Sequence, residues 1–277
     1  MTSTEISQHN PLTGATSRAT LWLIGAALAA ILLTACSFGS TETVVQEDSF
    51  TVGASPRLNV VSENGKVTVL SAGSSPTVQV TATIKNPDRV NYAARQEGST
   101  VTVAAEVEKG FNFFGDSAGV RIEVLVPENI ALDLETSNGS VSVTGVSGPV
   151  SVATSNGGID ITNVVGEVNA RTSNGKIDIG EVSGQVDAET SNGAVRMTAA
   201  LQEGSKNRLR TSNGSVNVTL VDTPRVNLNA STSNGTISTD RSITTTGSSD
   251  PRRLVGTIGE GGPDLEIRTS NGSVTIR

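Results

Sequence analysis

Seven copies of the tetrapeptide Thr-Ser-Asn-Gly occupy the second half of this chain of 277 residues. The first four copies begin 18 residues apart, the next two follow at intervals of 21, and the last follows after 37. Regular repeats of about 20 residues are typical of solenoids, in which each repeat forms one coil that packs on its neighbours. The repeated threonines, asparagines and glycines are Thr136, Asn138, Gly139, Thr154, Asn156, Gly157, Thr172, Asn174, Gly175, Thr190, Asn192, Gly193, Thr211, Asn213, Gly214, Thr232, Asn234, Gly235, Thr269, Asn271 and Gly272.

Apolar residues recur at fixed positions around these copies. The second and fourth residues after most of the glycines are Val, Ile or Met, as in Val141 and Val143 after Gly139. Such alternation of β-branched and polar residues predicts short strands with one buried face. No aromatic residue follows Phe114. The repeats must therefore form a thin core from aliphatic side chains.

Two architectures fit these repeats. Each Asn-Gly could close a two-residue hairpin of an antiparallel meander, or each repeat could be one coil of a parallel stack. The stack explains the whole tetrapeptide, because identical side chains lie above one another. The Asn amides can then form a ladder, the Thr hydroxyls can pair likewise, and Gly can supply a corner with positive φ. We therefore predict an all-β fold, a single-stranded parallel β-solenoid, similar to a β-helix, with repeats of about 18–21 residues.

The segment before the repeats is β-rich but irregular. Residues 49–133 contain short alternating runs, and the run "SENGKVTV" (62–69) resembles a diverged repeat with Gly65 at the corner. Residues 86–98 are the least strand-like, and we expect a short helical turn there. The long last interval of the repeats leaves room for one degenerate coil, with residues 241–263 as an insertion. We treat 49–133 and the repeat region 134–277 as one continuous domain.

The N-terminus carries the features of a lipoprotein signal. The uncharged run "LWLIGAALAAILL" (21–33) spans roughly 20 Å as a helix, which is short for a membrane core of about 30 Å. Leu33-Thr34-Ala35-Cys36 resembles a bacterial lipobox, and Cys36 is the only cysteine of the chain. We predict a signal peptide over residues 1–35 and a tether over 36–48 that is lipidated at Cys36. An uncleaved signal anchor is the alternative.

Catalytic and metal-binding residue types are scarce. The only histidine, His9, lies in the predicted signal peptide, so the mature chain lacks the usual base for nucleophilic catalysis. Asp160 and Asp178 occupy equivalent repeat positions and form a weak calcium candidate. The formal charge is -7 without a basic patch, which argues against nucleic acid as a partner. We expect no cofactor and no enzymatic activity.

Three further features are candidates for contact with a partner. Residues Phe111, Phe113 and Phe114 lie in one loop, which either caps the stack or presents an apolar patch. The residues before three successive threonines, Arg171, Glu189 and Arg210, alternate in charge and would form an exposed ion-pair column. The rows of Ser and Thr hydroxyls could also contact glycans. A carbohydrate-active β-helix enzyme or a glycan-binding protein is the alternative function.

The chain resembles the bacterial "putative adhesin" family of cell-envelope proteins. The resemblance covers residues 50–277 and rests on "LNVVSENGKVTV", on "VRIEVLVPENIALDLETSNGSVSVTG" and on the alternation of Thr-Ser-Asn-Gly with V-S-G-x-V segments. It implies a β-solenoid of stacked short strands behind a signal, a lipobox or a membrane helix, and it implies no reaction. We therefore expect a lipid-anchored adhesin or scaffold on the extracytoplasmic face of the bacterial envelope. Its partner, whether cell wall, glycan or protein, stays open.

Overall fold

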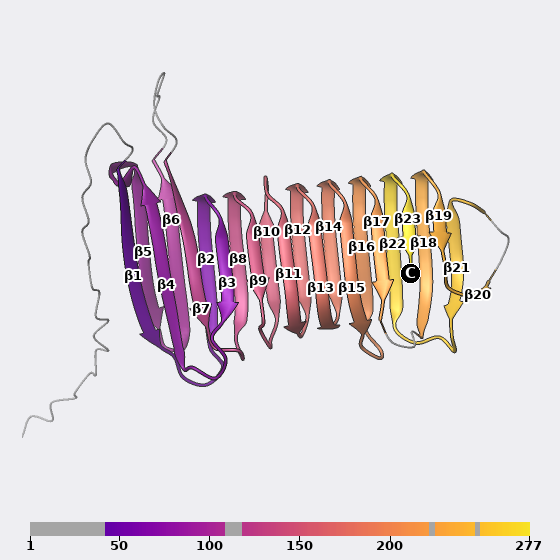
Figure 1. Ribbon diagram of the computed structural model, residues 1–277, viewed down its shortest axis with the longest axis horizontal. Helices are drawn as coiled ribbons and strands as arrows, with labels where there is room; N and C mark the ends of the chain where they lie inside the picture. The colour runs from indigo at the N-terminus through magenta and orange to yellow at the C-terminus, as the bar shows by residue number, and fades with distance from the viewer. Residues whose placement is uncertain (1–41, 109–117, 222–224, 247–249) are drawn as a thin grey trace, which may run out of the picture.

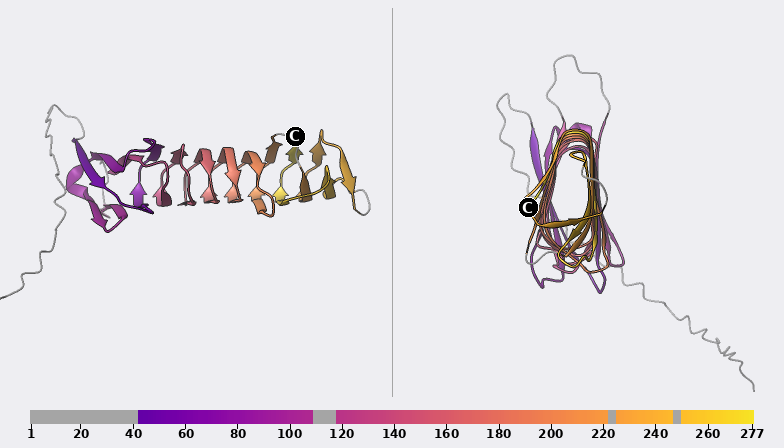
Figure 2. Two further views of the ribbon diagram at one scale, coloured as in Figure 1. Left: turned by 90° about the horizontal axis from the view of Figure 1, so that it is seen from below. Right: turned by 90° about the vertical axis from the view of Figure 1, so that its right-hand side faces the viewer.

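The described part of the chain forms an elongated stack of β-strands. The computed structural model describes residues 42–108, 118–221, 225–246 and 250–277. The strands lie side by side along the long axis (Figure 1), and the view along that axis shows a flattened tube with two layers (Figure 2). The two layers are two long β-sheets, which face each other across the core.

The first sheet has 11 strands. In spatial order they are β1 (Thr43–Thr51), β4 (Thr77–Lys85), β7 (Gly119–Val126), β3 (Val67–Ser71), β9 (Val141–Thr144), β11 (Ile159–Val165), β13 (Ile177–Gly184), β15 (Val195–Leu201), β17 (Val216–Leu220), β23 (Val274–Ile276) and β19 (Ile237–Thr239).

The second sheet has 12 strands. They are β20 (Ile243–Thr245), β21 (Arg253–Ile258), β18 (Val226–Asn234), β22 (Asp264–Asn271), β16 (Lys206–Asn213), β14 (Val186–Asn192), β12 (Val168–Asn174), β10 (Val150–Thr154), β8 (Ala131–Asn138), β2 (Arg57–Asn64), β6 (Thr100–Val107) and β5 (Val90–Glu97).

Each repeat forms one coil with a strand in each sheet, and neighbouring coils pair in parallel and in register. Thr154 of β10 lies opposite Thr136 on one side and Thr172 on the other. In the facing sheet, Ile159 lies between Val141 and Ile177. This register confirms the parallel β-solenoid and rules out an antiparallel meander for the repeats.

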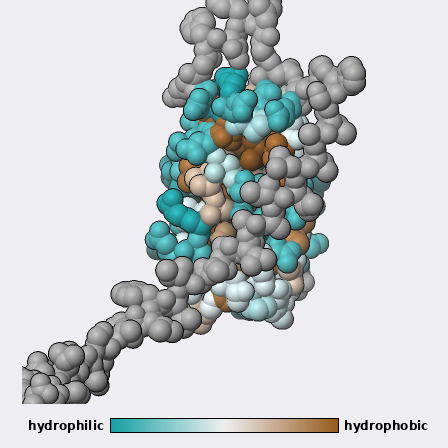
Figure 3. All heavy atoms as spheres, turned by 90° about the vertical axis from the view of Figure 1, so that its left-hand side faces the viewer, coloured by the Kyte–Doolittle hydropathy of each residue, from teal (hydrophilic) through white to brown (hydrophobic). Residues whose placement is uncertain are grey.

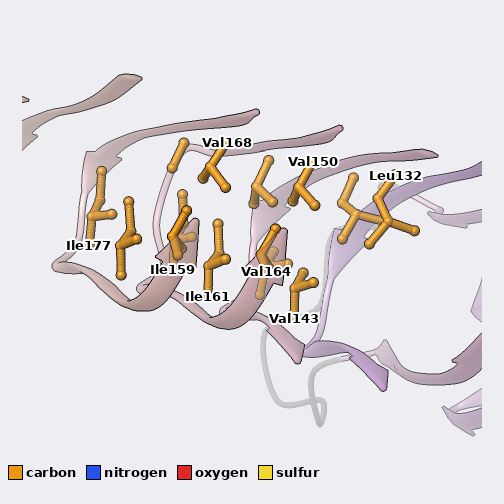
Figure 4. Packing of buried hydrophobic residues seen from close by; sticks show 14 of the residues in the cluster. Leu132, Val143, Val150, Ile159, Ile161, Val164, Val168 and Ile177 are labelled. Atoms are coloured by element: carbon orange, nitrogen blue, oxygen red, sulfur yellow. The ribbon is translucent and has the colours of Figure 1, made fainter. Parts of the chain in front are cut away.

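The core between the sheets consists of aliphatic rows. Leu132, Val150 and Val168 form one row of a sheet, and Ile159 and Ile177 lie in the facing row (Figure 4). All five side chains are at most 3% exposed. Short branched side chains suffice because the two layers lie close together. The absence of aromatic residues after Phe114 is therefore compatible with a fully buried core.

The N-terminal end differs from the predicted boundaries. Strand β1 begins at Thr43 and pairs antiparallel with β4, so the prediction of a tether over residues 36–48 is wrong from 43 onward. Polar residues such as Asp48 occupy inward positions of this edge strand. The strand therefore lacks the alternation of apolar and polar residues by which a strand is predicted from sequence. The Tyr92 hydroxyl donates a hydrogen bond to Asp48 at 3.0 Å. Burial of this ring, together with the Asp48 carboxylate, raises the pKa of Tyr92 above its ordinary value.

Polar inward residues suit this end of the stack, where the last sheet edges meet solvent. Hydrophilic residues surround a smaller hydrophobic area on this face (Figure 3). Charged and polar side chains at such positions discourage pairing with a foreign strand.

The helical turn expected within 86–98 is present as a 3-10 helix at Pro87–Arg89. Residues 90–97 form strand β5, which was not predicted from the sequence.

The diverged repeat at 62–69 is a true coil of the stack. Strand β2 pairs in parallel with β8, and Asn64 lies opposite Asn138. Strand β3 pairs in parallel with β9. The solenoid therefore starts before the first Thr-Ser-Asn-Gly copy, and the irregular part and the repeats share both sheets.

The C-terminal coils do not follow the order of the sequence. Strands β22 and β23 lie between the coil of β16 and β17 and the coil of β18 and β19. The expectation that each coil packs on the next one in sequence is wrong at this point. The described residues of the last interval form no additional parallel coil, and the segment 241–263 is an insertion, as expected. Its strands β20 and β21 pair antiparallel with each other, and β21 pairs antiparallel with β18.

Candidate functional site

The Thr-Ser-Asn-Gly copies form one continuous edge of the stack, where each chain segment passes from one sheet to the other. Its asparagine side chains form a ladder along the whole edge. Each donor Nδ2 lies 2.8–3.0 Å from the Oδ1 of the neighbouring coil. In spatial order the ladder contains Asn64, Asn138, Asn156, Asn174, Asn192, Asn213, Asn271 and Asn234.

The threonines of the edge have a different partner from the predicted one. The Thr172 hydroxyl donates to the carbonyl oxygen of Gly157 at 3.0 Å. Five further threonines make the equivalent bond to a glycine carbonyl of the adjacent coil, at 2.8–3.0 Å. The expectation that Thr hydroxyls pair with one another is therefore wrong. Thr136 is the exception, because its buried hydroxyl has no hydrogen-bond partner among the described residues.

We expect Thr172→Val to lower the free energy of unfolding by about 1–2 kcal/mol. The substitution keeps the shape of the side chain but leaves the Gly157 carbonyl without its donor. Thr136→Val is the matched control, since its buried hydroxyl has no bond to lose. We expect this control to be neutral or stabilising. Urea unfolding measures both, and equal destabilisation by the two variants would contradict the role of the hydroxyl.

The glycines of the edge are required by close stacking. A Cβ atom on Gly175 would lie 1.8 Å from the carbonyl oxygen of Gly157, and one on Gly193 would lie 2.0 Å from that of Gly175. The prediction of a corner with positive φ is wrong for most copies. Within the Asn-Gly pairs of the ladder, only Gly65 and Gly272 have such a φ. No side chain fits because each coil lies directly on the previous one.

A shallow groove of about 360 Å³ runs beside this edge on the outer face of the second sheet. Ala153 leaves the depression because its side chain is shorter than those of Glu135 and Arg171 in the adjacent coils. The groove also contains Glu189 and a row of exposed serine hydroxyls, contributed by Ser155, Ser173 and Ser191. Its surface is therefore polar and carries both charges.

The two carboxylates of this groove are too far apart for glycoside hydrolysis. Glu135 and Glu189 lie on strands separated by three strand spacings, or about 14 Å. Glycosidases hold their two carboxyl groups about 5–9.5 Å apart. Arg171 also approaches Glu189 at 3.9 Å. The groove is suited to contacts with a polar ligand rather than to acid–base catalysis of this kind.

The predicted charge column is only partly formed. Arg171 approaches Glu189, but Arg210 approaches Glu266 of the inserted strand β22 at 3.4 Å. The Glu266 carboxylate also forms ion pairs with Arg208, at 3.3 Å from its Nε, and with Arg268, at 2.5 Å from its Nη2. Partial burial alone would raise the pKa of this carboxyl. Hydrogen bonding to Arg208 and the charges of the arginines outweigh that effect and hold the pKa of Glu266 below its ordinary value.

We expect the stabilisation by Glu266 to depend on pH. Because its pKa is lower in the folded state, the stabilisation is present above about pH 4.5 and is lost as the pH falls through the folded-state value. Glu266→Gln should therefore lower the urea midpoint at pH 7, and the deficit should be smaller at pH 3. Glu260→Gln, at a side chain that is 88% exposed, is the control. A deficit of equal size at both pH values would contradict the electrostatic origin.

The calcium candidate is a pair of aspartates without further acidic ligands. Asp160 and Asp178 lie opposite each other on β11 and β13. Lys176 and Arg196 approach the Asp178 carboxylate at 2.5 and 3.1 Å. Burial tends to raise the pKa of Asp178, but hydrogen bonds from these two cations lower it overall. Within the described ranges, no three His, Cys, Asp or Glu side chains gather where they could hold a metal ion.

Two predicted sites lie outside the described residues. They are Cys36 and the group Phe111, Phe113 and Phe114. The described part of the chain contains no helix with the length and apolar character needed to cross a membrane. The groove around Ala153 and the role of Glu266 were not predicted from the sequence. A search for a carboxylate opposite Arg208 and Arg210 would have pointed to Glu266.

Comparison with known proteins gives a family match over the repeats. The Toastrack DUF4097 family model matches residues 128–277, which is more than half of the chain. No curated protein sequence matches. Solved structures similar to this chain include a "putative adhesin" from Bacteroides fragilis, with 11% identity and a TM-score of 0.40, covering 86% of this chain and 98% of that one. A "putative cell adhesion protein" from Clostridium sporogenes has 12% identity and a TM-score of 0.36, and covers 84% of this chain and 98% of its own.

Proposed function

The chain belongs to the Toastrack DUF4097 family, and we propose that it is a non-enzymatic, lipid-anchored protein of the bacterial cell surface that presents its repeated edge and groove to other molecules. The observation that supports this proposal best is the continuous asparagine ladder, which joins eight coils into one straight edge. Such an edge serves adhesion or scaffolding better than catalysis.

The ladder supports a rigid surface. From Thr154 onward, the coils are held to one another by two sheets, by threonine–glycine bonds and by asparagine bonds, as at Thr172 and Asn174. With 11 or 12 strands at about 4.8 Å each, the stack is about 50 Å long. A stack of this length is a short stalk, which can hold a contact surface above the headgroups of a membrane.

The proposed anchor lies next to one end of the stack. Strand β1 is the outermost strand of its sheet at the N-terminal end (Figure 1). Six residues lie between Cys36 and Thr43, and the seven residue steps from one to the other span at most about 25 Å when extended. A lipid on Cys36 would therefore keep this end near the membrane and leave the C-terminal coils farther away.

The groove supports glycan binding as a second candidate function. It is open and polar, and it offers the hydroxyls of Ser155, Ser173 and Ser191 beside the charged side chains of Arg171 and Glu189. Hydroxyl, carboxylate and guanidinium groups are suitable hydrogen-bonding partners for sugar hydroxyls. Rows of this kind would also explain why the surface beside the edge is polar along several coils.

We expect Cys36→Ala to abolish incorporation of a fatty-acid analogue and to move the protein from the membrane fraction to the soluble fraction. The thiol is the attachment point of the proposed lipid, and several acyl chains are needed for firm anchoring. Wild-type cells and cells with Ser40→Ala, in the same predicted tether, are the controls. The soluble variant can then be tested for retention on purified cell-wall and glycan fractions.

Two outcomes would contradict parts of this proposal. If wild-type protein incorporates no lipid analogue, the anchor is wrong. If lipid is incorporated but neither the cell-wall nor the glycan fraction retains the soluble variant, contact with these two materials is wrong. Ala153→Arg, which fills the groove, distinguishes a contact in the groove from one elsewhere on the edge.

A further inference from the structure

The coil that ends the chain occupies an internal position in the stack. We call residues 264–277 the C-terminal coil and the space that they fill the insertion slot. The slot is bounded by β16 and β17 on one side and by β18 and β19 on the other. Both neighbours lie earlier in the sequence. The segment that fills the slot is therefore not the one that connects the two neighbouring coils in sequence.

The C-terminal coil makes a complete set of contacts in the slot. Its inward side chains Leu265, Ile267, Val274 and Ile276 are at most 1% exposed. Thr269 donates to the carbonyl of Gly214 on one side, and Thr232 donates to that of Gly272 on the other. Asn271 completes the asparagine ladder in the same way. These contacts bind a two-stranded segment by backbone pairing, apolar burial and the edge motif.

The charges distinguish this segment from the neighbouring strand β18. Without the C-terminal coil, β18 would pack directly on β16, and Arg208 and Arg210 would then lie opposite the uncharged Asn229 and Ser231. In the actual order the Glu266 carboxylate lies between the two sides and accepts Arg208 at 3.3 Å and Arg210 at 3.4 Å. A carboxylate at this position therefore fits the arginines on one side of the slot better than the uncharged residues of β18 would.

The C-terminal coil is joined to the rest of the stack by a short connector, which does not fix the copy of the chain that supplies the coil. Strand β21 ends at Ile258 and β22 begins at Asp264, so five residues, Gly-Glu-Gly-Gly-Pro, join them. Gly259 and Gly261 of this connector have positive φ, a backbone conformation that glycine adopts readily. A short connector rich in glycine can follow more than one path into the slot.

We propose that the insertion slot is a strand-acceptor site that takes the C-terminal coil of a second copy of this chain as well as its own. The contacts within the slot are the same whichever copy supplies the coil, and only the path of residues 259–263 differs. Two copies can therefore exchange C-terminal coils, so that each copy fills the insertion slot of the other. Such domain swapping is a low-cost route to a dimer. Such an exchange would join two rods near their C-terminal ends, independently of the proposed function.

The first test asks whether the slot accepts the coil without a covalent connection. A protease site replaces residues 259–262 in the chain that begins at Cys36, and the purified protein is cleaved. We expect the cleaved protein to stay folded and to incorporate a fluorescent peptide of residues 264–277, measured by co-elution in gel filtration. A peptide with Glu266→Arg should be incorporated at least tenfold less. Unfolding on cleavage, or equal incorporation of both peptides, would overturn the acceptor site.

The second test asks whether a second copy is a partner. Two full-length chains with different tags are unfolded together in urea and refolded at low and at high protein concentration. We expect mixed dimers at high concentration, and fewer of them when ten Gly and Ser residues lengthen the 259–263 connector, because a longer connector favours closure within one chain. Monomers alone at every concentration would overturn exchange between copies, even if the peptide binds.

Discussion

A chain that ends at Pro263 is expected to lose its cooperative fold and to aggregate. The truncation removes β22 and β23, so the coils on both sides of the insertion slot lose their pairing partner. It also removes four buried aliphatic side chains, which contribute roughly 6–12 kcal/mol. The total stability of a domain is only about 5–15 kcal/mol.

Circular dichroism and gel filtration measure this outcome. Ser270→Ala, at an exposed position of the full-length chain, is the control and should retain the β signal and the elution volume of the wild type. A truncated protein that elutes as a folded monomer and unfolds at the wild-type temperature would show that β18 can close directly on β16. The inserted coil would then be dispensable for the fold.

Gly175→Ala is expected to lower the free energy of unfolding by at least about 3 kcal/mol, which corresponds to a fall in Tm of roughly 6–12 °C. The added Cβ would lie 1.8 Å from the Gly157 carbonyl oxygen and 2.5 Å from its carbon. This carbonyl cannot move freely, because it accepts the Thr172 hydroxyl. Separation of the two coils would also weaken the asparagine bond between Asn174 and Asn156.

Gly180→Ala is the matched control for this prediction. Gly180 lies in the same repeat, on β13, and a Cβ there would be 3.8 Å from the Thr162 methyl group, an ordinary contact. We expect its effect on stability to stay within about 0.5 kcal/mol. Differential scanning calorimetry compares the two variants. A tolerated Gly175→Ala would mean that the coils stack less closely than the structure shows.

The stack could be predicted from the sequence because the repeated residues form hydrogen bonds and apolar contacts with the equivalent residues of adjacent coils. Asn138 and Asn156 are identical and 18 residues apart, and a parallel in-register arrangement is the one that lets them bond to each other. The buried rows of Val and Ile followed from the same spacing. The aligned residues were thus sufficient for the coil, the sheet pairing and the polar edge.

The sequence could not predict features that depend on which coils are neighbours. A repeat carries the same corner whether it packs on the next repeat or on the last one, so the position of β22 was not evident from Thr269 and Asn271. The role of the glycines was misread because a turn and a close contact both favour Gly. Strand β1 was missed because its inward residues include Gln46 and Asp48, which serve an exposed end rather than a core.

The internal position of the last coil sets an order on folding. Strand β16 cannot pair with β22 until residue 264 and those after it are available. The paired residues Lys206 and Asp264 are 58 positions apart in sequence. A growing chain therefore cannot complete the stack before residues 264–277 have been synthesised. Pairings between distant segments also slow folding. The stack thus remains open between β16 and β18 until residues 264–277 pair with both strands.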